Sequence, residues 1–260
     1  MTQTQLQDLV LVPGHAPFKA AVTDVPTDPQ SDESWVLQPF QSGEPPFYLE
    51  HIRQGVTLTL DNPRSLLIFS GGRTRPAAGE WSEARTYLEI ARAHRFWLSD
   101  TGEPKNPTFD EVTRRTTTEV CARDSFENLL FAICRFQQVV GSYPRRVTVV
   151  GWAFKAERFG LHRNALSYPS PRFEYVGVND PVDLDSVQEG ERTAIRLFRK
   201  SPYGVGGTLA DKRARRNPFS REHDYRRCPG LQSFFAFMDD GANAESMFVG
   251  NLPWQERPRG

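Results

Sequence analysis

The residues with the clearest capacity for chemistry are Ser70-Gly71-Gly72-Arg73-Thr74-Arg75. They directly follow residues 65–69, an apolar run without alternation that predicts a buried parallel strand. Glycine lets the backbone turn and approach a ligand closely, and ligands of open α/β sheets lie beyond the carboxyl ends of strands. We therefore expect a ligand site at residues 70–75. The alternative is a solvated turn, because two glycines fall short of a dinucleotide or P-loop fingerprint.

Ser70 is the candidate nucleophile of this stretch. A serine on a sharp turn after a strand could accept an acyl group, and the amides of Gly71 and Gly72 could bind the oxyanion. In the alternative interpretation Ser70 only donates a hydrogen bond to a bound ligand. A nearby G-x-S-x-G elbow is absent, which argues against a hydrolase of nucleotides or esters that uses this serine.

Three further residues are candidates for moving a proton, namely His15, Glu119 and Glu127. His15 follows Pro13 and Gly14 at the end of the first expected strand, where it could also be a turn histidine bonded to the backbone. Glu119 lies in a β-prone segment, where an acid is unusual unless it faces solvent or a site. Glu127 has the spacing from Asp124 of a capping box, which is its structural alternative.

A basic helix is expected directly after a fourth strand that ends in Gly151. Lys155, Arg158 and His162 would share one face of this helix. If the helix starts at the strand end, its basic face and its amides would suit an anion. Glu83, near the start of an earlier helix, either favours the helix dipole or faces the pocket.

The segment 192–227 is strongly basic, with eleven Lys or Arg residues and three acids in a chain of zero net charge. Such asymmetry indicates a polyanionic partner, and a transfer RNA is the concrete hypothesis. A solvated arginine-rich surface is the alternative. The candidate nucleic-acid contacts are Lys212, Arg213, Arg215 and Arg216.

The composition restricts the class of protein. The chain has 260 residues, 38% of them hydrophobic, with 20 prolines, which predicts an ordinary core with much irregular chain. Three widely spaced cysteines predict neither a zinc site nor a disulfide framework. A leader and an 18-residue apolar run are both absent, so we expect a cytoplasmic protein with no membrane and no DNA partner.

Strands and helices alternate about five times, which predicts an α/β, Rossmann-like parallel sheet with helices on both faces. We expect a domain over residues 1–200 and an irregular, basic C-terminal extension over 201–260. The proline-rich segment 16–46 is interpreted as a lid over the first two strand ends. The expected strands are 6–12, 65–69, 116–121, 146–151 and 172–178, and the expected helices are 46–60, 79–94, 122–140, 152–166 and 185–200.

In their order along the chain these motifs resemble the DUF218 family, which includes YdcF- and SanA-type bacterial proteins. The resemblance covers about residues 6–180 and is strongest to a soluble fungal branch. It lies in residues 8–14, Ser70-Gly71-Gly72, Glu83, Glu119, Asp124, Ser125, Glu127, Asn128, Val149-Val150-Gly151 and Arg158. It implies a Rossmann-like fold and a pocket for a nucleotide-like ligand such as S-adenosylmethionine, but it does not imply a settled reaction. Separately, we expect that no cofactor is required. Bacterial members usually carry a membrane anchor, which we do not expect in this protein.

The resulting ligand-binding candidates are Gly14, Gly71, Gly72, Arg73, Arg75, Glu83, Asp124, Ser125, Asn128, Gly151, Lys155 and Arg158.

Two functions remain open. The first is a group-transfer enzyme, concretely an aminoacyl-tRNA-dependent cyclodipeptide synthase with an arginine-type substrate, similar in architecture to the arginine-incorporating enzymes of fungi. Acidic residues could then bind the guanidinium. The second is a protein that binds a nucleotide or S-adenosylmethionine without acyl chemistry.

Overall fold

The structure is a computed structural model that describes residues 5–19, 28–93, 109–181 and 183–255. Five parallel strands form a single sheet in the order β3-β2-β1-β4-β5. The strands are Asp8–Pro13 (β1), Ser65–Ser70 (β2), Thr116–Glu119 (β3), Arg146–Gly151 (β4) and Phe173–Gly177 (β5). The α/β class, the parallel sheet and the five strand positions predicted from the sequence are confirmed.

The three inner strands read as apolar runs because both of their faces are covered. Leu11 of β1 pairs with Ile68 of β2 on one side and with Val149 of β4 on the other, and all three side chains are fully buried. The edge strands β3 and β5 are more polar and only partly buried. Continuous apolar runs are therefore found only where parallel strands are sandwiched between helix layers.

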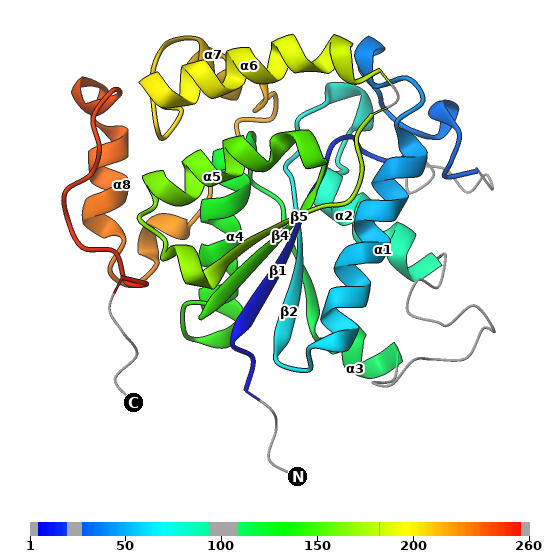
Figure 1. Cartoon of the computed structure of the whole chain (residues 1–260), viewed down its shortest axis with the longest axis horizontal. Coiled ribbons are helices and arrows are strands. Elements are labelled where there is room, and N and C mark those ends of the chain that lie inside the picture. The colour runs from blue at the N-terminus through cyan, green and yellow to red at the C-terminus, as the bar shows by residue number, and fades with distance from the viewer. Residues whose placement is uncertain (1–4, 20–27, 94–108, 182, 256–260) are drawn as a thin grey trace.

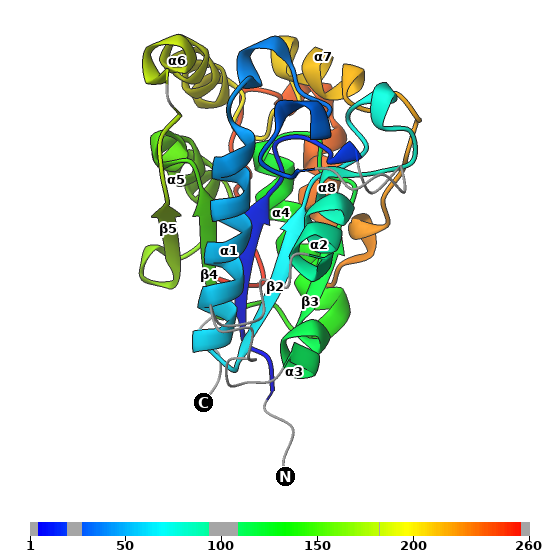
Figure 2. The same ribbon diagram turned by 90° about the vertical axis from the view of Figure 1, so that its right-hand side faces the viewer.

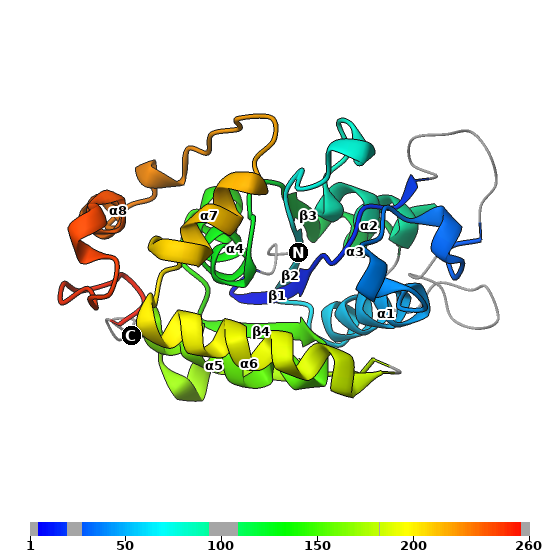
Figure 3. The same cartoon turned by 90° about the horizontal axis from the view of Figure 1, so that it is seen from above.

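Helices cover the two faces of the sheet (Figure 3). The helices Pro45–Asp61 (α1), Glu83–Ala93 (α2) and Phe109–Arg114 (α3) lie on one face, where α1 and α2 pack through Ile52, Val56 and Tyr87. The helices Ser125–Val140 (α4) and Ala156–Ala165 (α5) lie on the other, with Phe126 and Leu130 in their core. The sheet thus separates two hydrophobic cores.

The order of the strands places a topological switch point between β1 and β4. The connection from β1 runs through α1 to β2 on one face, whereas the connection from β4 runs through α5 to β5 on the opposite face. The chain therefore leaves β1 and β4 in opposite directions, and a crevice opens beyond their carboxyl ends. Ligands of doubly wound sheets bind at such a crevice.

Three segments lie across this end of the sheet (Figures 1 and 2). They are residues 28–44, the helix Leu184–Lys200 (α6) and the helix Gly207–Arg215 (α7). The first segment includes the short 3-10 helices Asp32–Ser34 and Pro39–Gln41. It is held by Trp35, which is 1% exposed and packs edge-to-face against Tyr48 and Tyr87. Together these segments form a roof over the crevice.

The C-terminal region differs from the irregular tail that the sequence predicts. It contains α7 and the helix Gln232–Asp239 (α8), and Leu231, Phe234 and Trp254 join the same core as α4. The helical pattern of this region is short and interrupted by turns, which is why periodicity alone missed it. Part of the expected lid (20–27) and residues 94–108, which include the end of the expected helix 79–94, lie outside the described residues. In the described part of the chain, none of the helices is both long and apolar enough to cross a membrane.

Candidate functional site

A cavity of about 480 Å³ lies at the switch point. Its floor is formed by Gly14 and His15 after β1, by Gly151 and Trp152 at the end of β4, and by the start of α4. Residues of the roof segment 28–44, α6 and α7 close it from above. This volume lies within the range of small-molecule sites, and its position agrees with the general rule for open α/β sheets.

One wall of the cavity is basic. Lys155 and Arg158 come from the start of α5, and Lys212 and Arg216 come from α7 and the residue after it. Arg158 is paired with Glu191 at 3.0 Å. The ammonium groups of Lys155 and Lys212 form no ion pair or hydrogen bond with another residue that the structure describes. Two ammonium groups thus meet the cavity with no carboxylate of the described residues within ion-pair distance, although Glu191 and Glu44 act on Lys155 and Asp124 acts on Lys212 from farther away.

The pKa values of these lysines reflect this crowding. Burial, and then the neighbouring Arg158, lower the pKa of Lys155 to about 7. Lys212 as a whole is exposed, but partial desolvation of its ammonium group, followed by Arg216 and Arg158, lowers its pKa to about 8. Cations that are partly desolvated and repel one another at a cavity wall favour binding of an anion, because the anion would compensate for the lost hydration and would reduce the repulsion.

The opposite side of the cavity carries acids. Thr74 Oγ1 donates a hydrogen bond to Glu83 Oε1 at 2.6 Å, and the carboxylate of Glu83 also interacts electrostatically with Arg75. Arg75 donates to Gln41 Oε1 at 3.2 Å, while its buried Nε has no partner among the described residues. The hydroxyl of Tyr48 donates to Glu44, whose pKa is raised mainly by burial. The cavity therefore has a basic wall and a mixed, partly acidic wall.

Gly71 and Gly72 do not line this cavity, contrary to the sequence prediction. A Cβ on Gly71, whose φ is +155°, would lie 2.7 Å from Glu83 Oε2. A Cβ on Gly72 would lie 2.7 Å from the carbonyl oxygen of Ala122. The two glycines allow close contact with α2 and with the β3–α4 loop, so the pattern reports packing within the protein and not an approach to a ligand.

Ser70 is also placed differently from the predicted nucleophile. Its side chain is fully buried and does not line the cavity. Its Oγ lies 2.7 Å from Glu119 Oε2 and 2.8 Å from Asn128 Oδ1. A hydroxyl has one proton and cannot donate to both oxygens. A protonated Glu119 that donates to Ser70, which then donates to Asn128, satisfies every group, so this network joins β2, β3 and α4.

Glu119 is fully buried, and burial raises its pKa from 4.5 to about 7. Its oxygens also accept hydrogen bonds from the amides of Cys121 and Ala122 and from the hydroxyl of Tyr225. Like Ser70, it is not in contact with the cavity. The predicted role of Glu119 as a base is therefore corrected to that of a buried, protonatable link between the sheet and the C-terminal region.

A consequence of this network is measurable as a pH dependence of stability. The folded protein keeps a proton on Glu119 that the unfolded chain releases above its usual pKa of 4.5. The stability that the folded protein gains from this proton is fully present below pH 4.5 and is lost as the pH rises through about 7. We expect Glu119→Gln to gain about 3 kcal/mol of unfolding free energy relative to the wild type between about pH 5 and about pH 8, measured by urea denaturation.

The matched control is Glu89→Gln on the surface of α2, where the carboxylate is 41% exposed. Its pH dependence should follow that of the wild type, since surface substitutions usually change stability by less than about 0.5 kcal/mol. Parallel pH profiles of Glu119→Gln and the wild type would show that Glu119 is already ionised in the folded protein.

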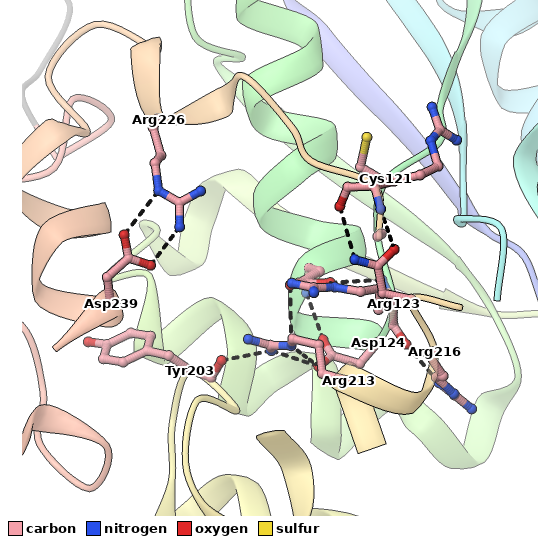
Figure 4. Close-up of polar contacts among 12 residues, drawn as sticks. Cys121, Arg123, Asp124, Tyr203, Arg213, Arg216, Arg226 and Asp239 are labelled. Atoms are coloured by element: carbon pink, nitrogen blue, oxygen red, sulfur yellow. Dashed lines mark hydrogen bonds and ion pairs between the residues drawn. The ribbon is translucent and has the colours of Figure 1, made fainter. Parts of the chain in front are cut away.

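The start of α4 is joined to α7 by buried ion pairs (Figure 4). Arg213 is 6% exposed, contacts Asp124 Oδ2 at 2.6 Å and Glu127 Oε1 at 3.2 Å, and donates to the carbonyl of Tyr203. Arg123 also donates to Glu127. The proposed base Glu127 is thus occupied by two arginines and does not line the cavity, and the predicted nucleic-acid contact Arg213 is buried. Both predictions are corrected to structural roles.

The remaining predicted residues are divided between the cavity and the outer surface. Arg215 is exposed, and Arg73 lies over Phe219 and donates to the carbonyl of Gly79, away from the cavity. His162, expected to share the basic face of α5, is instead buried, with its Nε2 2.7 Å from Ser125 Oγ. The predicted ligand-binding residues that do line the cavity are Gly14, Arg75, Glu83, Asp124, Ser125, Asn128, Gly151, Lys155 and Arg158.

His15 lines the cavity between its two walls. Its ring lies 5.1 Å from that of Tyr48 and 5.9 Å from that of Trp152, measured between centroids. Burial, followed by the charge of Lys155, lowers its pKa well below the usual value of 6.5, so the ring is neutral at physiological pH. Among the described titratable side chains predicted to be catalytic, His15 is the one that meets the cavity.

Sequence reasoning missed several lining residues, because they come from segments without a recognised motif. Gln41 and Glu44 belong to the roof segment, and Glu191 lies on α6. Lys212 was predicted to bind nucleic acid, but here it faces the cavity. Trp152 could have been predicted from its position directly after β4, because residues that follow strand ends at a switch point line the ligand crevice.

A Saccharomyces cerevisiae protein, named as the uncharacterized protein YOR238W, is similar to this chain. The two are 28% identical over 302 aligned residues, which cover 95% of this chain and 97% of the yeast protein. No family model matches the chain, and no solved structure matches it significantly. The resemblance to the DUF218 family is thus not supported by a family model, and it stays a prediction.

Proposed function

We propose that the protein is a group-transfer enzyme that binds an anionic, nucleotide-sized small molecule in the cavity at the switch point. The observation that carries this proposal is the pair of ammonium groups, on Lys155 and Lys212, that meet the cavity without a carboxylate partner among the described residues. A phosphate or carboxylate of the ligand would lie between them. Arg216 is near enough to both to lower their pKa values.

The apolar part of the cavity supports a ligand with a planar or hydrophobic portion. Trp152, Phe154, Phe159 and Tyr175 all line it close to the basic wall. Aromatic faces of this kind stack on nucleobases or pack against other apolar groups. Nucleotides and S-adenosylmethionine both combine a planar base with charged groups, which agrees with the ligand class that the resemblance to DUF218 proteins implies.

His15 supports chemistry as well as binding. A neutral imidazole at a cavity wall can accept a proton from a water, hydroxyl or amine as that group attacks its target. Ser70 has no comparable access, because it is buried behind Asn128. The role of the nucleophile is therefore assigned to a group of the substrates, with His15 as the base.

The aminoacyl-tRNA-dependent synthesis of an arginine-containing cyclodipeptide stays a prediction. Lys212, Arg215 and Arg216 lie on and after α7, at the roof of the cavity, where they could contact RNA phosphates. Glu44 and Glu83 could read a guanidinium. The acyl-serine mechanism, however, would need Ser70 to become accessible.

Expression in a heterologous host with untargeted metabolite analysis tests the proposal. We expect a product that depends on the protein, that falls at least about tenfold in His15→Gln and that remains in Ser70→Ala once corrected for the amount of folded protein. Loss of the product in Ser70→Ala alone would favour the acyl-serine mechanism. Identical profiles from all three proteins and from an empty host would favour a binding protein without catalysis.

A further inference from the structure

His15 is the first member of a chain of side chains that runs from the cavity to the surface. His15 Nε2 lies 3.2 Å from His51 Nδ1, and His51 Nε2 lies 2.9 Å from Asn179 Oδ1. The amide nitrogen Nδ2 of Asn179 donates to Glu50 Oε2 at 2.5 Å. His51 and Glu50 belong to α1, whereas Asn179 follows β5, so residues from three parts of the chain meet here.

The last member of this chain fixes the direction of every hydrogen bond in it. The carboxylate of Glu50 only accepts, so Asn179 must present its NH2 group to Glu50 and its oxygen to His51. His51 then carries its proton on Nε2, and its Nδ1 can only accept. His15 must therefore carry its proton on Nε2, which leaves the lone pair on its Nδ1.

The Nδ1 atom of His15 has no hydrogen-bond partner among the described residues and is not fully buried, so it is open to the cavity that His15 lines. The residue is held on other sides as well. Its amide donates to the hydroxyl of Tyr87, and its carbonyl accepts from Gln41 Nε2. A side chain held in this way keeps one rotamer and one direction toward a ligand.

We infer that His51, Asn179 and Glu50 are positioning residues that hold His15 in the Nε2–H tautomer, so that its Nδ1 accepts a proton from the nucleophile of the bound substrate. This inference rests on the proposed function for its chemical meaning. In the step, the nucleophile of one substrate forms a bond to the transferred group while its proton moves to Nδ1. The bond between the transferred group and the leaving group then breaks, the leaving group keeps the electron pair, and the imidazolium returns the proton to it. His51 stabilises the imidazolium by accepting from Nε2–H.

Burial, together with the neighbouring cations, keeps both rings of the histidine pair neutral. The pKa of His15 is lowered by burial and by Lys155, His51 and Arg158. The pKa of His51 is lowered to about 3, mainly by burial, and the hydrogen bond to Asn179 opposes this shift. Two neutral rings in one fixed proton order constitute a base that is ready before binding.

The tautomers can be measured without any ligand or activity. We expect long-range ¹H–¹⁵N NMR spectra of the labelled wild-type protein near neutral pH to show His15 and His51 each as a single neutral Nε2–H tautomer. A proton on Nδ1 of His15, or an average of two tautomers, would overturn the inference.

Two variants test whether the chain sets the tautomer. Asn179→Leu removes the acceptor, and Glu50→Ala, at an exposed position, leaves the amide of Asn179 free to rotate. Both should give a second tautomer at His15, whereas Asn217→Leu, in a loop after α7, should not. If Asn179→Leu fails to fold, Glu50→Ala decides, since a surface change rarely unfolds a domain. Unchanged spectra in the variants would overturn the inference even with the expected wild-type tautomer.

This outcome is separable from that of the proposed function. If the cavity binds no anion but the tautomers are as expected, the proposed function fails and the proton order remains. If an anion binds and the tautomers differ, the positioning chain fails alone.

Discussion

Arg213→Met should lower the unfolding free energy by about 3–5 kcal/mol, because it removes one partner of a buried charge network. Asp124 and Glu127 would lose their shared guanidinium, which contacts them at 2.6 and 3.2 Å. Burial alone would raise the pKa of Asp124, and Arg213 is the largest of the interactions that instead lower it. The variant thus leaves an uncompensated carboxylate at the start of α4, and urea denaturation measures the loss.

The neighbouring residue on the same helix provides the control. Arg215 is exposed, and Arg215→Met should change stability by no more than about 0.5 kcal/mol. Adding Asp124→Asn to Arg213→Met should restore part of the loss, because the carboxylate charge is then removed. Equal, small effects of both arginine variants would show that Arg213 is not part of the structural network.

The second large effect concerns binding. Lys155→Met should weaken the affinity for inorganic pyrophosphate or ADP by about tenfold to a hundredfold, the usual range for a hydrogen bond to a charged group. Lys155 lines the basic wall and has no ion-pair partner among the described residues, so its ammonium is available to the ligand. Isothermal titration calorimetry of both proteins measures the difference, and Lys200→Met, at the exposed end of α6, is the control.

The pH dependence of this affinity has a defined sign. The pKa values of Lys155 and Lys212 are about 7 and about 8 in the free protein, and a bound anion would raise both. Binding therefore takes up protons, and the affinity should fall as the pH rises through this interval. In Lys155→Met the fall should be smaller and should begin at higher pH. An affinity independent of pH in the wild type would contradict protonation of these lysines on binding.

The sheet could be predicted from the sequence because its physical signal is local. Residues 66–69 are apolar throughout and residues 147–151 are apolar except for Thr148, and parallel strands buried on both faces need such runs. The two edge strands could also be predicted, because turn residues and the starts of helices flank them in the sequence and so mark where each strand begins and ends. Helix α2 begins later than predicted, at Glu83, because Pro76–Ala78 form a 3-10 turn that ends at Gly79 with a φ of +57°.

The site could be predicted only in part, because its position depends on the order of the strands in space. Gly71 and Gly72 after β2 were predicted to bind a ligand, but the space beside them is occupied by Glu83 and by the backbone of Ala122. The cavity lies at β1 and β4 instead, and their adjacency follows from the path of α4 across the sheet, which is a long-range feature. Lys155 and Arg158 were found because they start a helix directly after a strand.

The basic C-terminal segment shows a second limit. Arg213 and Arg215 have the same side chain and lie two positions apart, but one is buried against Asp124 and the other faces solvent. Only the packing of α7 on α4 separates their roles. Likewise, the partnership of His15 with His51 and Asn179 joins residues far apart in the chain, and nothing in the local sequence indicates it.

A crystal structure of the protein soaked with inorganic pyrophosphate tests the central claim most directly. The account predicts phosphate density in the cavity at the switch point, within hydrogen-bond distance of Lys155 Nζ and Lys212 Nζ and next to the His15 ring. Density confined to the outer surface, at Arg215 or along the exposed side of α6, with an empty switch-point cavity at a saturating concentration, would contradict it.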